Sequence, residues 1–120
     1  MNKTVVLDFD GTICAFKFPD VGEPIPGVKE ALEKIKEMGY RIVIHSVRTA
    51  SYWNSGDENF RPCQEHIKII EEYMEKHHLP YDDIWLADKP IAIAYVDDRA
   101  VRFKGSWKEV IDEIVELEMK

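Results

Sequence analysis

Short apolar runs alternate with amphipathic segments along this chain, and this alternation predicts strands separated by helices. Residues 4–9, 41–46 and 91–96 are each rich in apolar and β-branched residues, and residues 84–86 form a shorter apolar run. Runs without polar residues at every second position are typical of parallel strands that are buried on both faces. We therefore predict four strands, of which the three longer ones lie inside the protein.

Three further segments have apolar residues at helical spacing. Residues 28–38 are followed by Gly39, a common residue just beyond a helix end, and residues 67–78 precede Pro80. A last helix is expected to begin near Ser106, where Glu109 completes the pattern of a capping box. Strands that alternate with helices predict an α/β fold, a three-layer sandwich with a doubly wound parallel sheet. The apolar residues of the last helix are expected to point inward: Val110, Ile111, Ile114, Val115 and Leu117.

Length and composition add limits to this picture. The chain has 120 residues, 45% of them hydrophobic, which predicts one domain over residues 1–120. No segment approaches the roughly 18 apolar residues of a membrane span, and Cys14 and Cys63 are not spaced as a redox or zinc pair, so we expect a cytoplasmic protein without a membrane partner. The net charge of −7 opposes non-specific nucleic-acid binding but does not exclude a nucleic-acid partner.

Polar residues that could take part in catalysis or ligand binding follow the predicted strands. Asp8 and Asp10 come after the first strand, Ser46 after the second, and Asp97 and Asp98 after the run at 91–96. Ligands of open parallel sheets bind beyond the carboxyl ends of the strands, so we expect these side chains to converge. A carboxylate such as Asp8 can attack a phosphoryl group and form an aspartyl-phosphate, and Asp10 is placed to act as the general acid and base.

Such a reaction also needs groups that hold and neutralise phosphate oxygens. Ser46 can supply a hydroxyl and Lys89 an ammonium. Asp8, Asp97 and Asp98 at one rim would repel each other and an anionic substrate unless a hard divalent cation lies among them. We therefore expect Mg²⁺, which would also stabilise the charge of the transition state.

These residues resemble the four motifs of the haloacid dehalogenase-like hydrolases. The first motif is similar to residues 8–12, read as DFDGT, and the second to residues 42–46, which end in Ser46. The third motif corresponds to Lys89 before Pro90, and the fourth to the acidic pair Asp97 and Asp98. The resemblance covers nearly the whole chain and implies a Rossmann-like fold.

The resemblance also implies a role for each motif residue. Asp8 would be nucleophile and metal ligand, and Asp10 would be the acid and base and offer its backbone carbonyl to the metal. Ser46 and Lys89 would bind phosphate. Asp97 would ligate the metal directly, and Asp98 directly or through water. Because dehalogenase members lack the second aspartate, Asp10 favours phosphate esters as substrates.

In this family, additional cap domains cover the site. The gap at residues 13–26 is too short for a cap, so the chain resembles a capless member. Capless members act on large substrates or use a neighbouring subunit to close the site, which makes a homo-oligomer a further expectation. Residues 47–62 are the best internal lid, and Arg48 and Arg99 are candidate substrate contacts.

The sequence-based function is thus a magnesium-dependent phosphomonoester hydrolase. Its substrate would be a phosphorylated small molecule or the phosphorylated end of a macromolecule. The alternative is a non-enzymatic phosphoacceptor or signalling module of receiver type, a class of similar length. Asp57 suggests this class, but the phosphoacceptor of a receiver ends a central strand, whereas Asp57 lies in a polar loop. Asp10 favours the hydrolase, because an acid and base beside the nucleophile shortens the life of a phosphorylated intermediate.

Overall fold

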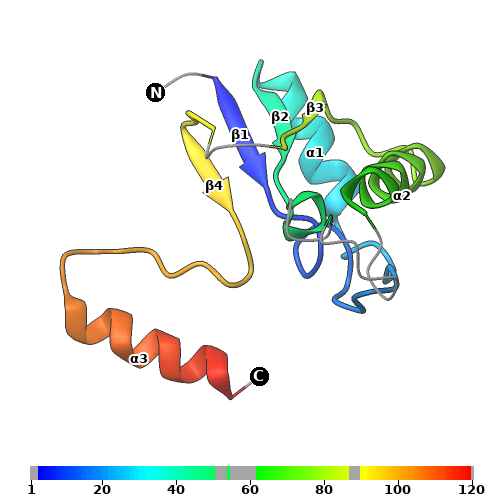
Figure 1. Ribbon diagram of the computed structural model, residues 1–120. Helices are drawn as coiled ribbons and strands as arrows, with labels where there is room; N and C mark the ends of the chain where they lie inside the picture. The colour runs from blue at the N-terminus through cyan, green and yellow to red at the C-terminus, as the bar shows by residue number, and fades with distance from the viewer. Residues whose placement is uncertain (1–2, 51–53, 55–61, 87–89, 120) are drawn as a thin grey trace.

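A four-stranded, all-parallel sheet is the centre of the fold (Figure 1). The computed structural model describes residues 3–50, 54, 62–86 and 90–119. In the sheet, the strands lie in the order β3-β2-β1-β4. The strands are β1 (Thr4–Leu7), β2 (Arg41–Ile44), β3 (Asp83–Ile84) and β4 (Ala94–Val96). The predicted α/β class with a doubly wound parallel sheet is confirmed.

Two helices pack on one face of this sheet and form the main core. They are α1 (Val28–Glu37) and α2 (Cys63–Lys76), and a short 3-10 helix, η1 (Val47–Thr49), follows β2. Alternate strand residues such as Leu7 and Ile44 contact Leu32 of α1 and Ile70 of α2 in one buried cluster. Gly39 follows α1 with a φ of +85°, in agreement with the predicted helix end. No helix among the described residues is long and apolar enough to cross a membrane.

The first two strands end before the predicted boundaries because the chain turns toward the site. The carbonyl of Phe9 accepts hydrogen bonds from the backbone N–H groups of Thr12, Ile13 and Cys14, which closes a tight turn directly after β1. Residues 13–15 then run antiparallel to residues 23–25 and form a small flap. The flap therefore begins directly after the stretch that the first motif spans, residues 8–12.

The opposite sheet face is covered less completely. Val6, Val43 and Ala92 form a small buried cluster against Trp85. Every residue of β4 is exposed, so the prediction of a buried strand at residues 91–96 is wrong in this respect. The physical reason is its place at the edge of the sheet, with no described helix packed over it.

The last helix, α3 (Trp107–Glu118), lies apart from the sheet (Figure 1). Its predicted cap is confirmed, because the Ser106 hydroxyl accepts a hydrogen bond from the Glu109 backbone N–H at 3.4 Å. The prediction that its apolar residues point inward is wrong, because no residue of α3 is buried. The radius of gyration, 15.3 Å, exceeds the value of about 13.6 Å expected for a compact chain of this length.

Candidate active site

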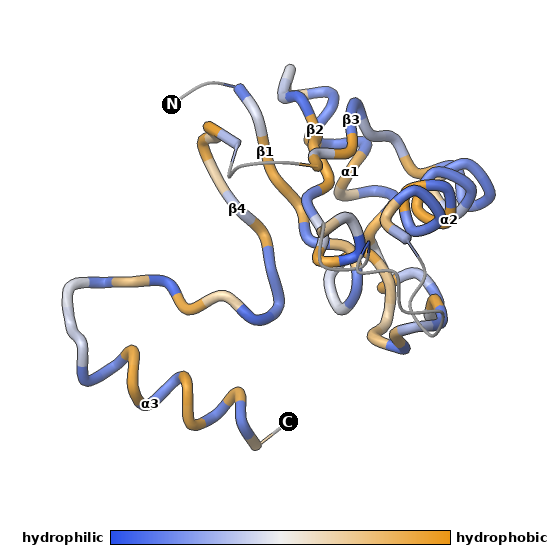
Figure 2. Tube along the Cα trace, viewed as in Figure 1, coloured by the Kyte–Doolittle hydropathy of each residue, from blue (hydrophilic) through white to orange (hydrophobic). Residues whose placement is uncertain are grey.

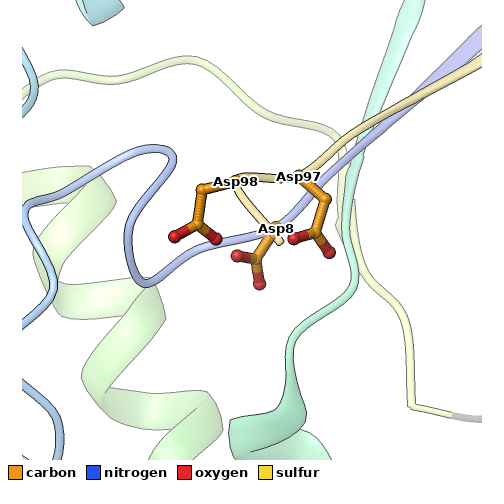
Figure 3. Close-up of side chains that lie close together, drawn as sticks. All are labelled: Asp8, Asp97 and Asp98. Atoms are coloured by element: carbon orange, nitrogen blue, oxygen red, sulfur yellow. The ribbon is translucent and has the colours of Figure 1, made fainter. Parts of the chain in front are cut away.

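Three carboxylates converge where β1 and β4 end. Leu7 and Val96 are paired in the sheet, and the Asp8 backbone N–H donates to the Val96 carbonyl at 2.9 Å. This pairing places Asp8 beside Asp97 and Asp98, and one oxygen of each carboxylate lies within 4.8 Å of the others (Figure 3). Two strands that lie near opposite ends of the sequence thus supply one acidic cluster.

The turn after β1 holds this cluster together. The Thr12 hydroxyl donates to Asp8 at 3.4 Å and accepts from the Asp98 backbone N–H at 3.2 Å, so it bridges the two strand ends. Gly11 has a φ of +86°, and a Cβ atom there would lie 2.3 Å from a carboxylate oxygen of Asp98. Glycine is therefore required both for the backbone conformation and for the approach of Asp98.

The environment of Asp8 disfavours its charged form. Partial burial, followed by the negative charges of Asp97 and Asp98, raises the pKa of Asp8 to about 7, although a hydrogen bond from the Phe9 backbone N–H acts in the opposite direction. A positive charge among the three carboxylates would relieve this repulsion. The cluster therefore has the electrostatic character of a cation site.

The chemistry of the donors fits a hard divalent cation. All three candidate ligands are carboxylates, which are the ligands that Mg²⁺ and Ca²⁺ prefer in proteins. The half-buried Asp8 and the exposed Asp97 and Asp98 leave one side of the cluster open to water or to substrate oxygens. A contribution from the Asp10 backbone carbonyl stays a prediction.

Asp10 is bound by Arg48 in a buried, bidentate ion pair. Arg48 Nε donates to Asp10 Oδ2 at 2.7 Å and Nη2 donates to Oδ1 at 2.8 Å. The Arg48 side chain is fully buried and the Asp10 side chain is 5% exposed. The same guanidinium donates to the carbonyls of Pro19 and Asp20, so it ties Asp10 to the flap.

Aromatic rings enclose the Arg48 guanidinium. The ring of Phe18 lies 4.8 Å from its central carbon and that of Phe9 lies 5.7 Å from it. His66, on the buried side of α2, has its Nδ1 atom 3.5 Å from Arg48 Nη1 and its ring stacked on Phe18. His66 is not among the site residues predicted from the sequence. Its spacing of four residues from Ile70, on the apolar face of α2, was the available signal.

Ser46 lies at the end of β2, as its motif predicts. It is buried, and its hydroxyl oxygen accepts a hydrogen bond from the Arg48 backbone N–H at 3.1 Å, which caps η1. The hydroxyl proton of a serine in this arrangement can still be donated to a phosphate oxygen. Lys89, the predicted second phosphate ligand, lies outside the described residues, as do Asp57 and most of the predicted lid at residues 47–62.

A pocket of 270 Å³ opens beside the acidic cluster. Its polar side consists of acidic residues and Arg99, and its apolar side consists of Phe16, Phe18 and Val47. Of the two arginines predicted to contact substrate, Arg99 is exposed in this pocket. Arg48 is buried behind it, and a substrate contact by Arg48 would require the guanidinium to leave Asp10. The lining acids are Asp8, Asp10, Asp97 and Asp98.

Two solved structures resemble this fold. The conserved protein of a locus from Bacteroides thetaiotaomicron is 24% identical, with a TM-score of 0.62 over 95% of this chain and 90% of that one. A crystal structure of a target protein from Vibrio cholerae is 31% identical, with a TM-score of 0.51 over 98% of this chain and 99% of that one. No family model and no curated protein matches the chain. The Bacteroides likeness supports the fold, and the Vibrio likeness supports common descent over the whole length.

Proposed function

We propose that this chain, which belongs to the same family as the Vibrio cholerae protein, is a phosphomonoesterase that uses Mg²⁺ and an aspartyl-phosphate intermediate. The observation that carries the proposal is the acidic cluster of Asp8, Asp97 and Asp98 at the ends of two adjacent parallel strands. Ser46, at the end of the neighbouring strand, adds a hydroxyl suited to a phosphate oxygen. The combination of a half-buried carboxylate, a cation site and a phosphate donor matches the needs of phosphoryl transfer.

In the proposed reaction, an oxygen of Asp8 attacks the phosphorus atom and the bond from phosphorus to the ester oxygen breaks. Asp10 gives a proton to the departing alcohol. Water then attacks the phosphorus of the aspartyl-phosphate, Asp10 takes a proton from that water, and the bond to the Asp8 oxygen breaks to release phosphate. Bound Mg²⁺ supplies charge neutralisation at the phosphate oxygens.

The ion pair with Arg48 regulates the availability of Asp10 in this scheme. Because the paired Asp10 side chain is only 5% exposed, we infer that one Asp10 oxygen exchanges its Arg48 contact for the ester oxygen or the water during proton transfer. Because Arg48 also holds the carbonyls of Pro19 and Asp20, this exchange is coupled to the position of the flap. Arg48 is therefore a positioning residue that acts through Asp10.

The volume and the lining of the pocket restrict the size and polarity of the substrate. A volume of 270 Å³ suits a phosphate with a small leaving group, and the Phe16 and Val47 side chains favour an apolar or aromatic group in it. We infer that aryl and other compact, partly apolar phosphate esters are better substrates than extended sugar phosphates.

The same ion pair favours a second candidate function, a phosphoacceptor that keeps its phosphate. If Asp10 stays bound to Arg48, Asp8 can accept a phosphoryl group but the hydrolysis of the acyl phosphate lacks its base. The protein would then accumulate as a phosphoprotein and release phosphate slowly.

Turnover of p-nitrophenyl phosphate and acetyl phosphate with and without Mg²⁺ tests the proposal. We expect magnesium-dependent phosphate release that EDTA removes, and a loss of at least about 10³-fold in Asp8→Asn, since no other carboxylate replaces the nucleophile. Asp83→Asn, in edge strand β3 with a partly exposed carboxylate, is the matched control and should retain activity. Activity in Asp8→Asn equal to that of the wild type would refute the phosphatase, and a stable acyl phosphate without turnover would select the second candidate.

A further inference from the structure

The apolar face of α3 has no covering surface within the described part of the chain. Trp107, Ile111, Ile114 and Val115 are all between 46% and 70% exposed, although their spacing forms one face of the helix. Figure 2 shows this alternation of apolar and polar positions along a helix that stands off the sheet. A 12-residue amphipathic helix without a packing partner is marginal in water, so this face needs a partner.

A groove beside β4 offers a surface of the same kind. It has a volume of 1000 Å³ and follows the open face of the sheet along Val6, Ile93 and Tyr95. Ile93 and Tyr95 are about half exposed. The groove reaches the candidate active site, because Asp8 and Asp97 also line it.

The solvent-accessible area of the chain is larger than that of a compact monomer, as expected if part of the surface is an interface. The chain exposes 8335 Å², whereas a compact monomer of 14.0 kDa exposes about 6,700 Å². The excess is about 1,600 Å² for each chain, and two chains would bury about twice that amount. This area lies within the range of stable homodimer interfaces, about 2,000–5,000 Å².

The segment before α3 directs the helix away from its own sheet. We call residues 97–106 the connector. It has ten residues, whereas connections between a strand and a helix in α/β folds typically have about two to six. Residues 101–104 have no helical or strand structure, and the rings of Phe103 and Trp107 pack at 5.0 Å, which holds the corner between the connector and α3. A connector of this length lets α3 reach beyond its own sheet, as exchange with another chain requires.

We propose that α3 is an exchanged arm: in a homodimer, α3 of each copy lies in the groove beside β4 of the other copy. A two-fold axis makes the two contacts identical, so the assembly closes at two subunits. The exchanged helix covers the open sheet face and forms one wall beside Asp8 and Asp97. The inference does not depend on the proposed phosphatase activity, but it would make the site complete only in the dimer.

Size-exclusion chromatography with light scattering on the full chain tests the assembly. We expect a mass twice that of the 14.0 kDa chain at micromolar concentration. Ile114→Asp should weaken the dimer more than 10-fold, because it places a charge in the buried face of the arm. Glu116→Gln, on the polar face of the same helix, should leave the dimer intact. A monomeric wild type, or a dimer that Ile114→Asp does not weaken, would overturn the proposal.

A mixing experiment separates exchange from α3 folding onto its own sheet. Ile114→Asp damages only the arm and Ile93→Asp damages only the groove. In an exchanged heterodimer, the intact arm of one variant meets the intact groove of the other, so mixing the two monomeric variants should restore dimers and raise thermal stability. If each arm packs on its own sheet, each chain keeps one damaged surface, and no recovery on mixing contradicts the exchange.

A second measurement covers the case in which either variant fails to fold. Wild-type chains labelled with ¹⁵N are unfolded and refolded together with unlabelled chains, then cross-linked. Under exchange, the dimers that contain one labelled and one unlabelled chain give cross-links between α3 and residues 90–97 that join a labelled to an unlabelled peptide. Cross-links that join only peptides of the same isotope would refute the proposal.

Discussion

The buried ion pair between Arg48 and Asp10 provides the sharpest test of the structure. Arg48→Met removes the guanidinium but keeps a long side chain in the space between Phe9 and Phe18. Asp10 then loses both charge-assisted hydrogen bonds, at 2.7 and 2.8 Å, while its side chain stays nearly inaccessible to water. The carbonyls of Pro19 and Asp20 lose the same donor.

The expected cost follows from the burial of Asp10. Removing one partner of a buried ion pair leaves an uncompensated charge and costs about 3–5 kcal/mol. A chain of this length has an unfolding entropy of about 0.25 kcal/mol/K, so the melting temperature should fall by about 12–20 °C. Arg41→Met is the matched control. Arg41 pairs with Asp83 at 3.2 Å with both side chains about half exposed, and its loss should cost less than about 1 kcal/mol.

Thermal and urea unfolding of both variants, followed by circular dichroism, measure these costs. The double variant Arg48→Met/Asp10→Asn removes both charges and should regain more than half of the lost stability, because a neutral amide is cheaper to bury than an unpaired carboxylate. Equal losses in Arg48→Met and Arg41→Met would refute the reasoning, since they would show that Asp10 is not held in a buried pair.

Three further predictions concern the site. Gly11→Ala should lower stability by about 1–2 kcal/mol and abolish the increase in melting temperature caused by Mg²⁺, because φ is +86° and the new Cβ would displace Asp98, whereas Gly27→Ala should show only the conformational cost. Since the pKa of Asp8 rises from 3.8 to about 7 on folding, its contribution to the stability of the metal-free protein should decline as pH increases from about 4 to 7. Unfolding in EDTA should show this decline, and Mg²⁺ should stabilise more at pH 8 than at pH 5; the same stabilisation at both would contradict it. Phe16→Ala should lower kcat/KM for p-nitrophenyl phosphate several-fold with little effect on acetyl phosphate, and equal losses for both substrates would exclude a contact with the aromatic group.

Much of the secondary structure follows from local sequence pattern. The errors of the prediction concern burial, which depends on packing between elements. The helix end at Gly39 and the cap at Ser106 involve only neighbouring residues, so the sequence predicts them. The apolar runs identify the strands, but the burial of a strand depends on what packs over it. The run at residues 91–96 therefore predicts β4 and misses its exposure at the edge of the sheet.

The sequence likewise predicts one part of the candidate site and not another. Order along the chain and position after strands suffice to select Asp8, Asp97 and Asp98, because the ends of parallel strands meet at one edge. The partner of Asp10 is different, since Arg48 lies 38 residues away and its donors also reach the flap. No spacing rule identifies such a contact, which forms only when the flap, η1 and α2 pack together.

By itself, the sequence determined the fold class, the element types and the residues that carry the candidate chemistry, because periodicity and strand-end position are local properties. Only the tertiary structure decided that Arg48 holds Asp10 and that, within the residues the structure describes, nothing buries the apolar face of α3. The reason is physical. The spacing of apolar residues in a helix indicates that one face must be buried, but the conformation of the connector determines which surface that face can reach.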